Sequence, residues 1–128
     1  MTTPMSLLLW SVLLGLVQCL ATGFAVSAAR GLDFSASSRD DQQPITGLGG
    51  RVLRAYTNFR ETYPYFVALV LAGEVLHRQS GLITMGAELY FWGRLIYWPL
   101  YVGGVPWIRS IIWLLASLGL VLMLIGLA

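Results

Sequence analysis

The sequence contains no lysine, one histidine and one cysteine, and only 11% of its 128 residues are charged. A single cysteine, Cys19, excludes a disulfide within the chain, and no Cys/His cluster has metal-ligand spacing, so no metal cofactor is expected. The basic residues are all arginines and form no basic run, which argues against nucleic acid as a partner. These absences exclude a disulfide scaffold, a metal centre and a nucleic-acid-binding domain.

Hydrophobic residues make up 57% of the chain, and its mean hydropathy is +0.73. A soluble domain carries about 25% charged residues, so this composition predicts an integral membrane protein, of a size that fits one domain over residues 1–128. A helix needs roughly 20 apolar residues to cross about 30 Å of hydrocarbon. We therefore expect an all-α, four-transmembrane-helix bundle, with helices at about 5–29, 51–76, 82–102 and 107–128.

Arginines cluster beside the first and third of the predicted loops. They are Arg30, Arg39, Arg51, Arg54 and Arg109. Arg78 is the arginine near the second loop. Because cytoplasmic loops carry an excess of arginine and lysine, we expect loops one and three in the cytoplasm and both termini outside.

The start of the second helix carries a polar stripe. At about 100° per residue, Arg51, Arg54, Asn58 and Glu61 fall within about 80° of one helix face. Polar and ionised groups on a membrane-entering helix are costly, so they usually mark a functional site.

Two further helices place polar side chains at the same depth. Arg94, Tyr97 and Tyr101 lie within about 60° of one face of the third helix. The fourth helix opens with Arg109-Ser110, and the predicted topology brings all three groups to the cytoplasmic side. We expect them to meet one or two turns inside the membrane interface.

The energetics favour a shared pocket. An ionised residue at a helix centre costs about 2.5–3.5 kcal/mol on insertion scales, so Glu61 and Arg94 should pair with each other or with a ligand. The polar side chains that these three helices bring together include more arginines than carboxylates. The resulting cationic pocket suits carboxylates, which arginine grips through two hydrogen bonds.

Each part of the set also has a structural interpretation. Arg51 can be an ordinary interfacial arginine, and Arg54 and Arg109 can extend to lipid headgroups. Asn58 and Glu61 can form a buried structural group with Arg94. The remaining aromatic residues can form an interfacial belt, and they are Tyr97, Trp98, Tyr101 and Trp107.

Two segments carry a resemblance to a known family. Residues 51–66, RVLRAYTNFRETYPYF, resemble the second-helix signature of the MAPEG family, the membrane-associated proteins in eicosanoid and glutathione metabolism. Residues 93–101, GRLIYWPLY, followed by Pro106 and Arg109-Ser110, match a second part of it. The resemblance covers nearly the whole chain and is greatest to the small bacterial branch, which implies a multi-pass protein of a bacterial inner membrane.

The resemblance implies a homotrimer that binds glutathione between subunits near the cytoplasmic face. It implies that glutathione is a bound co-substrate and that the other substrate is a small lipophilic electrophile reaching the site from the lipid. The implied glutathione-binding residues are Arg30, Arg51, Arg54, Asn58, Glu61, Arg94, Tyr97 and Tyr101. Arg109 matches an arginine implicated in activating the thiol, so it is the implied catalytic residue. The implied activity is a glutathione-dependent membrane transferase or peroxidase with a role in detoxification.

Some positions depart from the family pattern, and other functions stay open. Thr57 replaces an arginine and Tyr97 a histidine of members resembling prostaglandin E synthase, while Trp113 replaces a tyrosine near the site in some members. These changes put prostaglandin synthesis in doubt more than glutathione binding. One alternative is a non-catalytic trimer that binds glutathione or a lipid-like anion. A four-helix drug exporter is disfavoured because the first helix lacks the glutamate that such exporters carry.

Overall fold

A computed structural model describes residues 1–31 and 45–128, and all regular structure in this part of the chain is helical. The helices are α1 (Thr3–Arg30), α3 (Gly47–Val75), α4 (Gly81–Val102) and α5 (Trp107–Leu127). The predicted all-helical, four-helix architecture is confirmed, although α3 begins four residues before the expected position 51. Arg39 lies outside the described residues.

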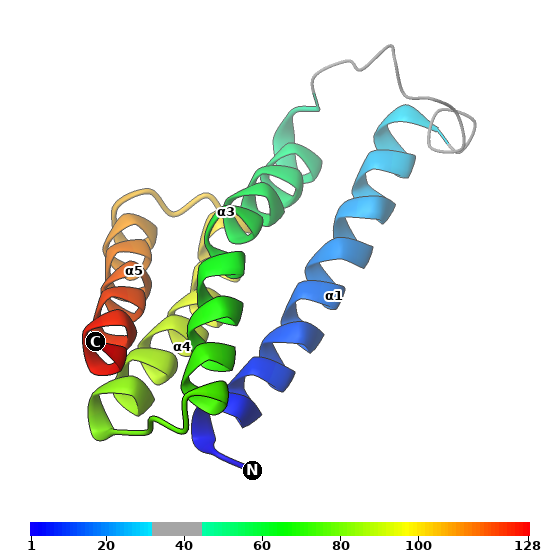
Figure 1. The fold of residues 1–128 in the computed structure, drawn as a ribbon. Coiled ribbons are helices and arrows are strands. Elements are labelled where there is room, and N and C mark those ends of the chain that lie inside the picture. Colours follow the sequence, from blue (N-terminus) through cyan, green and yellow to red (C-terminus); the bar gives the residue numbers. More distant parts are fainter. Residues whose placement is uncertain (32–44) are drawn as a thin grey trace.

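The helices run alternately up and down, so the connection at 103–106 lies at the same end as the C-terminal end of α1 and the start of α3 (Figure 1). The short 76–80 connection lies at the opposite end, which is the antiparallel arrangement that short loops predict. Local chemistry fixes two helix starts. The Thr2 hydroxyl accepts a hydrogen bond from the Met5 amide (3.3 Å), and the Ser80 hydroxyl accepts one from the Ile83 amide (3.2 Å).

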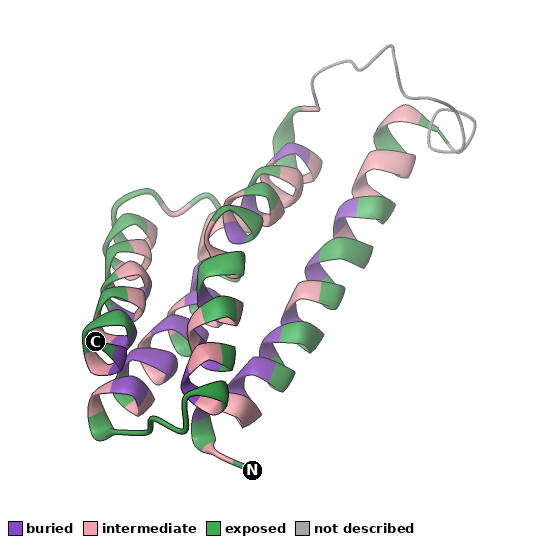
Figure 2. Ribbon diagram, viewed as in Figure 1, coloured by how far each residue is buried: buried purple, intermediate pink, exposed green. Residues whose placement is uncertain are grey.

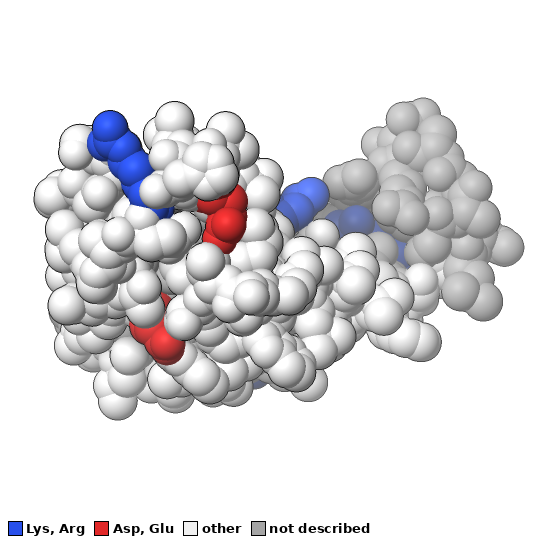
Figure 3. Space-filling model, turned by 60° about the horizontal axis from the view of Figure 1, so that its bottom comes forward, with Lys and Arg blue, Asp and Glu red and all other residues white. Residues whose placement is uncertain are grey.

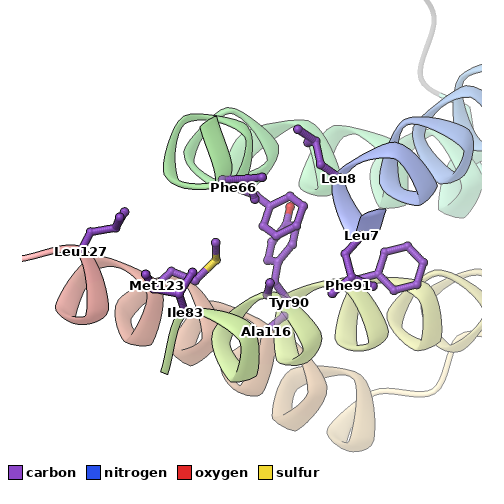
Figure 4. Close-up of a cluster of buried hydrophobic side chains, with 11 residues drawn as sticks. Leu7, Leu8, Phe66, Ile83, Tyr90, Phe91, Ala116, Met123 and Leu127 are labelled. Carbon is purple, nitrogen blue, oxygen red and sulfur yellow. The ribbon is translucent and has the colours of Figure 1, made fainter. Parts of the chain in front are cut away.

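The core lies between α3, α4 and α5 and extends to the first turns of α1 (Figure 4). Phe66 and Tyr90 stack at its centre with ring centroids 4.5 Å apart, and Met123 is fully buried beside them. Exposed positions cover the outward faces of the helices (Figure 2), and many of them are large apolar residues such as Trp10, Phe24 and Leu114. Such a surface is suited to lipid rather than to water.

Two helices among the described residues, α1 and α5, are long and apolar enough to cross a membrane. The other two have sufficient length, 29 and 22 residues, but carry the ionised side chains that the sequence singled out. Charge is also sparse on the face drawn in Figure 3, where a few coloured groups interrupt a largely uncharged surface.

Helices α4 and α5 pack with their backbones in close contact. A Cβ added at Gly119 would lie 2.9 Å from the Tyr90 amide nitrogen, and one added at Gly93 would lie 2.9 Å from the Ala116 Cβ. Small residues permit this approach, which membrane helices use to gain van der Waals contact. The closely packed α4–α5 pair fixes the relative positions of the polar side chains near the 103–106 connection.

Hydroxyl pairs join the helices inside the apolar core. Ser11 Oγ and Tyr63 Oη are 2.9 Å apart, and Thr62 Oγ1 and Tyr90 Oη are 3.0 Å apart. Replacing Tyr90, which is 1% exposed, with phenylalanine removes one of these bonds without changing the ring. We expect the free energy of unfolding to fall by about 0.5–1.5 kcal/mol, the usual worth of a hydrogen bond between helices in a membrane.

Denaturation of the detergent-solubilised protein measures this loss. Tyr65→Phe is the matched control, because Tyr65 is 64% exposed on the same helix as Thr62. Equal stabilities of the two variants would show that the Thr62–Tyr90 bond does not contribute.

Candidate functional site

A cavity of about 390 Å³ lies beside the 103–106 connection, between α3, α4 and α5. Polar and aromatic side chains from all three helices form its wall. The lining residues are Asn58, Tyr97, Tyr101, Arg109, Ser110, Trp113 and Leu114. The predicted meeting of three helices therefore holds for Asn58, Tyr97, Tyr101 and Arg109, which come together in one place.

Arg94 lies behind this wall rather than in it. It is 2% exposed, and its Nη1 donates a hydrogen bond to Asn58 Oδ1 at 2.9 Å. Its Cζ lies 4.4 Å from the centroid of the Tyr97 ring and 5.7 Å from that of Phe59. The buried guanidinium thus orients two of the residues that face the cavity, through one hydrogen bond and one cation–π contact.

Arg109 contacts the ring of Tyr101, which neighbours the ring of Tyr97. Its Cζ lies 4.5 Å from the centroid of the Tyr101 ring, and the Tyr97 and Tyr101 rings are 5.6 Å apart. The two tyrosine rings therefore stand between two guanidinium groups. This arrangement presents positive charge and phenol hydroxyl groups to one small volume, as recognition of an anion requires.

Arg51 contacts the end of α4 instead of the cavity. Its Nε donates a hydrogen bond to the carbonyl oxygen of Val102 at 2.8 Å, and its guanidinium lies against Gly104, whose φ is +77°. A cation at the carbonyl end of a helix is favourable, and this contact ties α3 to the 103–106 turn next to Arg109.

Besides Arg51 and Arg94, three predicted site residues do not line the cavity in the single chain, namely Arg30, Arg54 and Glu61. Arg54 and Glu61 are exposed, and Arg94 bonds to Asn58 rather than to Glu61. Arg30 is the last residue of α1, and within the described chain α1 packs against α3 and α4 but not against α5. These three side chains do not join Arg109 within one subunit.

The cavity also contains residues that the sequence reasoning did not assign to it. They are Ser110, Trp113 and Leu114, which follow Arg109 at intervals of one, four and five residues. Of these, Trp113 shares the helix face of Arg109, and its spacing of four residues was the available signal. The Ser110 hydroxyl donates to the Pro106 carbonyl oxygen at 3.3 Å, which leaves its oxygen able to accept a hydrogen bond from a ligand.

Among the described residues, no group of three or more His, Cys, Asp or Glu side chains gathers in a way that suits a metal ion. The cavity wall supplies arginine, amide and hydroxyl groups, which suit an organic anion.

Comparison with known proteins identifies a family. The sequence profile of the MAPEG family matches residues 7–128, which include every helix that contributes to the cavity. No curated protein and no solved structure matches the chain significantly. The family is membrane-associated and is made up in general of glutathione-related enzymes, with which an arginine- and tyrosine-lined cavity is consistent. The chain belongs to the MAPEG family.

Proposed function

We propose that this protein is a glutathione-dependent membrane transferase or peroxidase that acts on lipophilic electrophiles. The observation that carries the proposal is the cavity in which Arg109 faces Tyr97, Tyr101 and Asn58. Membership of a glutathione-related family supplies the identity of the anion.

The chemistry of the wall fits glutathione. Glutathione has two carboxylates and a thiol, and the wall of the cavity provides a guanidinium, phenol hydroxyls and an amide. The cavity volume, about 390 Å³, is near the lower end of the roughly 300–1,000 Å³ of small-molecule sites. A single subunit therefore encloses part of the tripeptide, and a neighbouring surface completes the site.

The positions of the remaining arginines support a homotrimer with a site shared between subunits. Arg54 and Glu61 are exposed at depths where an ionised group facing lipid is costly. Arg30 lies on α1, which packs against α3 and α4 but not against α5 within the described chain, so a neighbouring subunit is the route by which we propose that Arg30 reaches a ligand held by Arg109. A second copy that presents Arg30, Arg54 or Glu61 to the ligand satisfies both requirements.

The proposed reaction uses Arg109 to hold the glutathione sulfur as a thiolate. A thiol pKa about two units below its usual value corresponds to about 2.7 kcal/mol of differential stabilisation, within reach of one desolvated arginine hydrogen bond. The thiolate attacks an electrophilic carbon and forms a carbon–sulfur bond. The electrons of the broken bond go to the leaving group or, where an oxygen-containing ring opens, to the ring oxygen, which then takes a proton. With a lipid hydroperoxide, the thiolate instead attacks the terminal peroxide oxygen, forming a sulfur–oxygen bond as the oxygen–oxygen bond breaks. Glutathione is oxidised to its sulfenic acid, and the displaced alkoxide takes a proton and leaves as an alcohol.

The proposed orientation follows the arginines. The cavity end carries Arg30, Arg51, Arg54 and Arg109, whereas Arg78 lies at the opposite end. With four spans in a bacterial inner membrane, the rule of cytoplasmic arginine places the cavity and loops one and three on the cytoplasmic side. Glutathione reaches the cavity from the cytoplasm, and the lipophilic substrate reaches it from the bilayer.

Glutathione titration of the detergent-purified protein by calorimetry tests the proposal. Asn58→Ala removes a wall residue and the acceptor of the Arg94 bond, so we expect affinity to fall about tenfold or more. Arg60→Ala is the matched control, because Arg60 is an exposed arginine on the same helix that does not line the cavity. Chemical crosslinking of the same sample should end at three subunits.

Each outcome has a definite meaning. Absence of glutathione binding at millimolar concentration would reject the proposal, and a stable monomer would reject the shared site. Tight binding without turnover of any electrophile would favour the non-catalytic alternative.

A further inference from the structure

A second site lies at the level of Glu88, about 14 Å along α4 from Tyr97 and about 20 Å from Tyr101 of the cavity wall. Glu88 is about 10 Å from the start of this helix and about 21 Å from its end, so it lies well inside the apolar layer. It is half-buried, and its Oε2 accepts a hydrogen bond from Trp92 Nε1 at 2.7 Å. The glutathione proposal makes no use of either residue.

A recess of about 320 Å³ opens beside this pair between α4 and α5. Apart from Glu88 and Trp92, its wall is apolar or glycine. The remaining wall residues are Met85, Leu89, Gly93, Ile96, Ile112 and Leu115. The recess therefore combines one carboxylate, one indole ring and an otherwise hydrocarbon lining.

The carboxylate needs a partner that the described chain does not supply. The Trp92 indole is a neutral donor and leaves the charge uncompensated. The recess has no basic side chain in its wall. The arginines of α4 and α5 are committed elsewhere, Arg94 to Asn58 and Arg109 to the ring of Tyr101. An ionised carboxylate within the membrane marks a functional site because it is retained only with a counter-charge.

We propose that this recess binds a lipophilic organic cation, such as a quaternary ammonium or phosphonium compound, from the bilayer. Glu88 supplies the counter-charge, the exposed half of the Trp92 ring supplies a cation–π surface, and the apolar wall takes the hydrocarbon groups. A small hydrated metal ion does not fit, because one carboxylate in a hydrocarbon wall cannot replace its oxygen ligands. An anion is excluded by the sign of the charge.

Equilibrium dialysis of the full-length, detergent-purified protein against tetraphenylphosphonium tests the proposal. Glu88→Gln keeps an acceptor for Trp92 but removes the charge, so we expect cation affinity to fall about tenfold or more. Glu88→Asp should restore part of it. Glu74→Gln is the matched control, because Glu74 lies near an end of α3, accepts a hydrogen bond from Thr2 and does not line the recess.

The neutral analogue triphenylphosphine oxide separates charge recognition from apolar partition. Its binding should be the same in the wild type and in Glu88→Gln, while circular dichroism confirms that both are folded. The proposal is overturned if Glu88→Gln binds the cation as the wild type does, or if both probes weaken equally. It is also overturned if the wild type binds no tetraphenylphosphonium at millimolar concentration. None of these results depends on whether glutathione binds.

Discussion

Replacing Arg109 with alanine is expected to slow glutathione conjugation by about one to two orders of magnitude while leaving glutathione bound. The guanidinium faces the cavity beside Tyr101 and is the cation that the proposal assigns to the thiolate. Without it the thiol returns toward its usual pKa, and the ionised fraction at neutral pH falls accordingly. Asn58, Tyr97 and Tyr101 still line the cavity, so the proposed contacts of these residues with the tripeptide are expected to remain.

Two measurements on Arg109→Ala should therefore differ. The rate of conjugation with a lipophilic chloronitrobenzene should fall, while the glutathione dissociation constant should stay near the wild-type value. Arg109→Lys keeps a cation and should recover part of the rate, although lysine lacks the planar group that stacks on Tyr101. Arg60→Ala should match the wild type in both measurements. A rate that is unchanged in Arg109→Ala would remove Arg109 from the chemistry.

Replacing Arg94 with methionine is expected to weaken glutathione binding about tenfold or more without unfolding the protein. Arg94 is buried and does not line the cavity, so it acts through Asn58 and Tyr97, which it contacts at 2.9 Å and 4.4 Å. A buried ion replaced by an apolar side chain of similar length is often neutral for stability. Asn58 and Tyr97 would lose the group that fixes their orientation.

Comparison of two readouts shows whether Arg94 is a positioning residue. The glutathione dissociation constant should rise while the midpoint of thermal unfolding in detergent changes little, and Arg60→Met should change neither. Arg94→Ala should lower the midpoint as well, because truncation leaves a void beside Phe59. If Arg94→Met loses stability and affinity in parallel, the residue serves the fold rather than the site.

The helices were predictable from the sequence because their apolar runs are long and their breaks are clear. The four ranges agree with the structure within four residues at each end. The start of α3 was placed too late because Gly47, Gly49 and Gly50 are typical of a loop, yet they lie in its first turn. A Cβ at Gly50 would clash with the backbone of Ile45, so tight packing favours glycine there.

The candidate site was predictable in its location but not in its contacts. Helix periodicity brought Asn58, Tyr97, Tyr101 and Arg109 together correctly. Periodicity gives the direction of a side chain but not which neighbouring group it reaches. Arg51 therefore turned out to contact the Val102 carbonyl oxygen, a backbone acceptor that has no sequence signature.

The sequence also did not give the partners of the ionised side chains beside the 76–80 connection. A spacing of four residues between Glu74 and Arg78 is typical of an ion pair on a helix, but α3 ends at Val75 and the two side chains bond to other partners. Glu74 accepts a hydrogen bond from the Thr2 hydroxyl, and Arg78 donates to the Leu127 carbonyl oxygen at 2.6 Å. Both partners come from other helices, whose positions only the folded chain defines.

The ultraviolet absorbance of the thiolate on saturation with glutathione tests the central claim most directly, namely that Arg109 holds the glutathione sulfur as a thiolate in this cavity. The wild type should show a thiolate band at neutral pH that scales with occupancy of the site, and Arg109→Ala should bind glutathione without that band. A wild type that binds glutathione with no thiolate band, or a band of equal size in Arg109→Ala, would contradict the account.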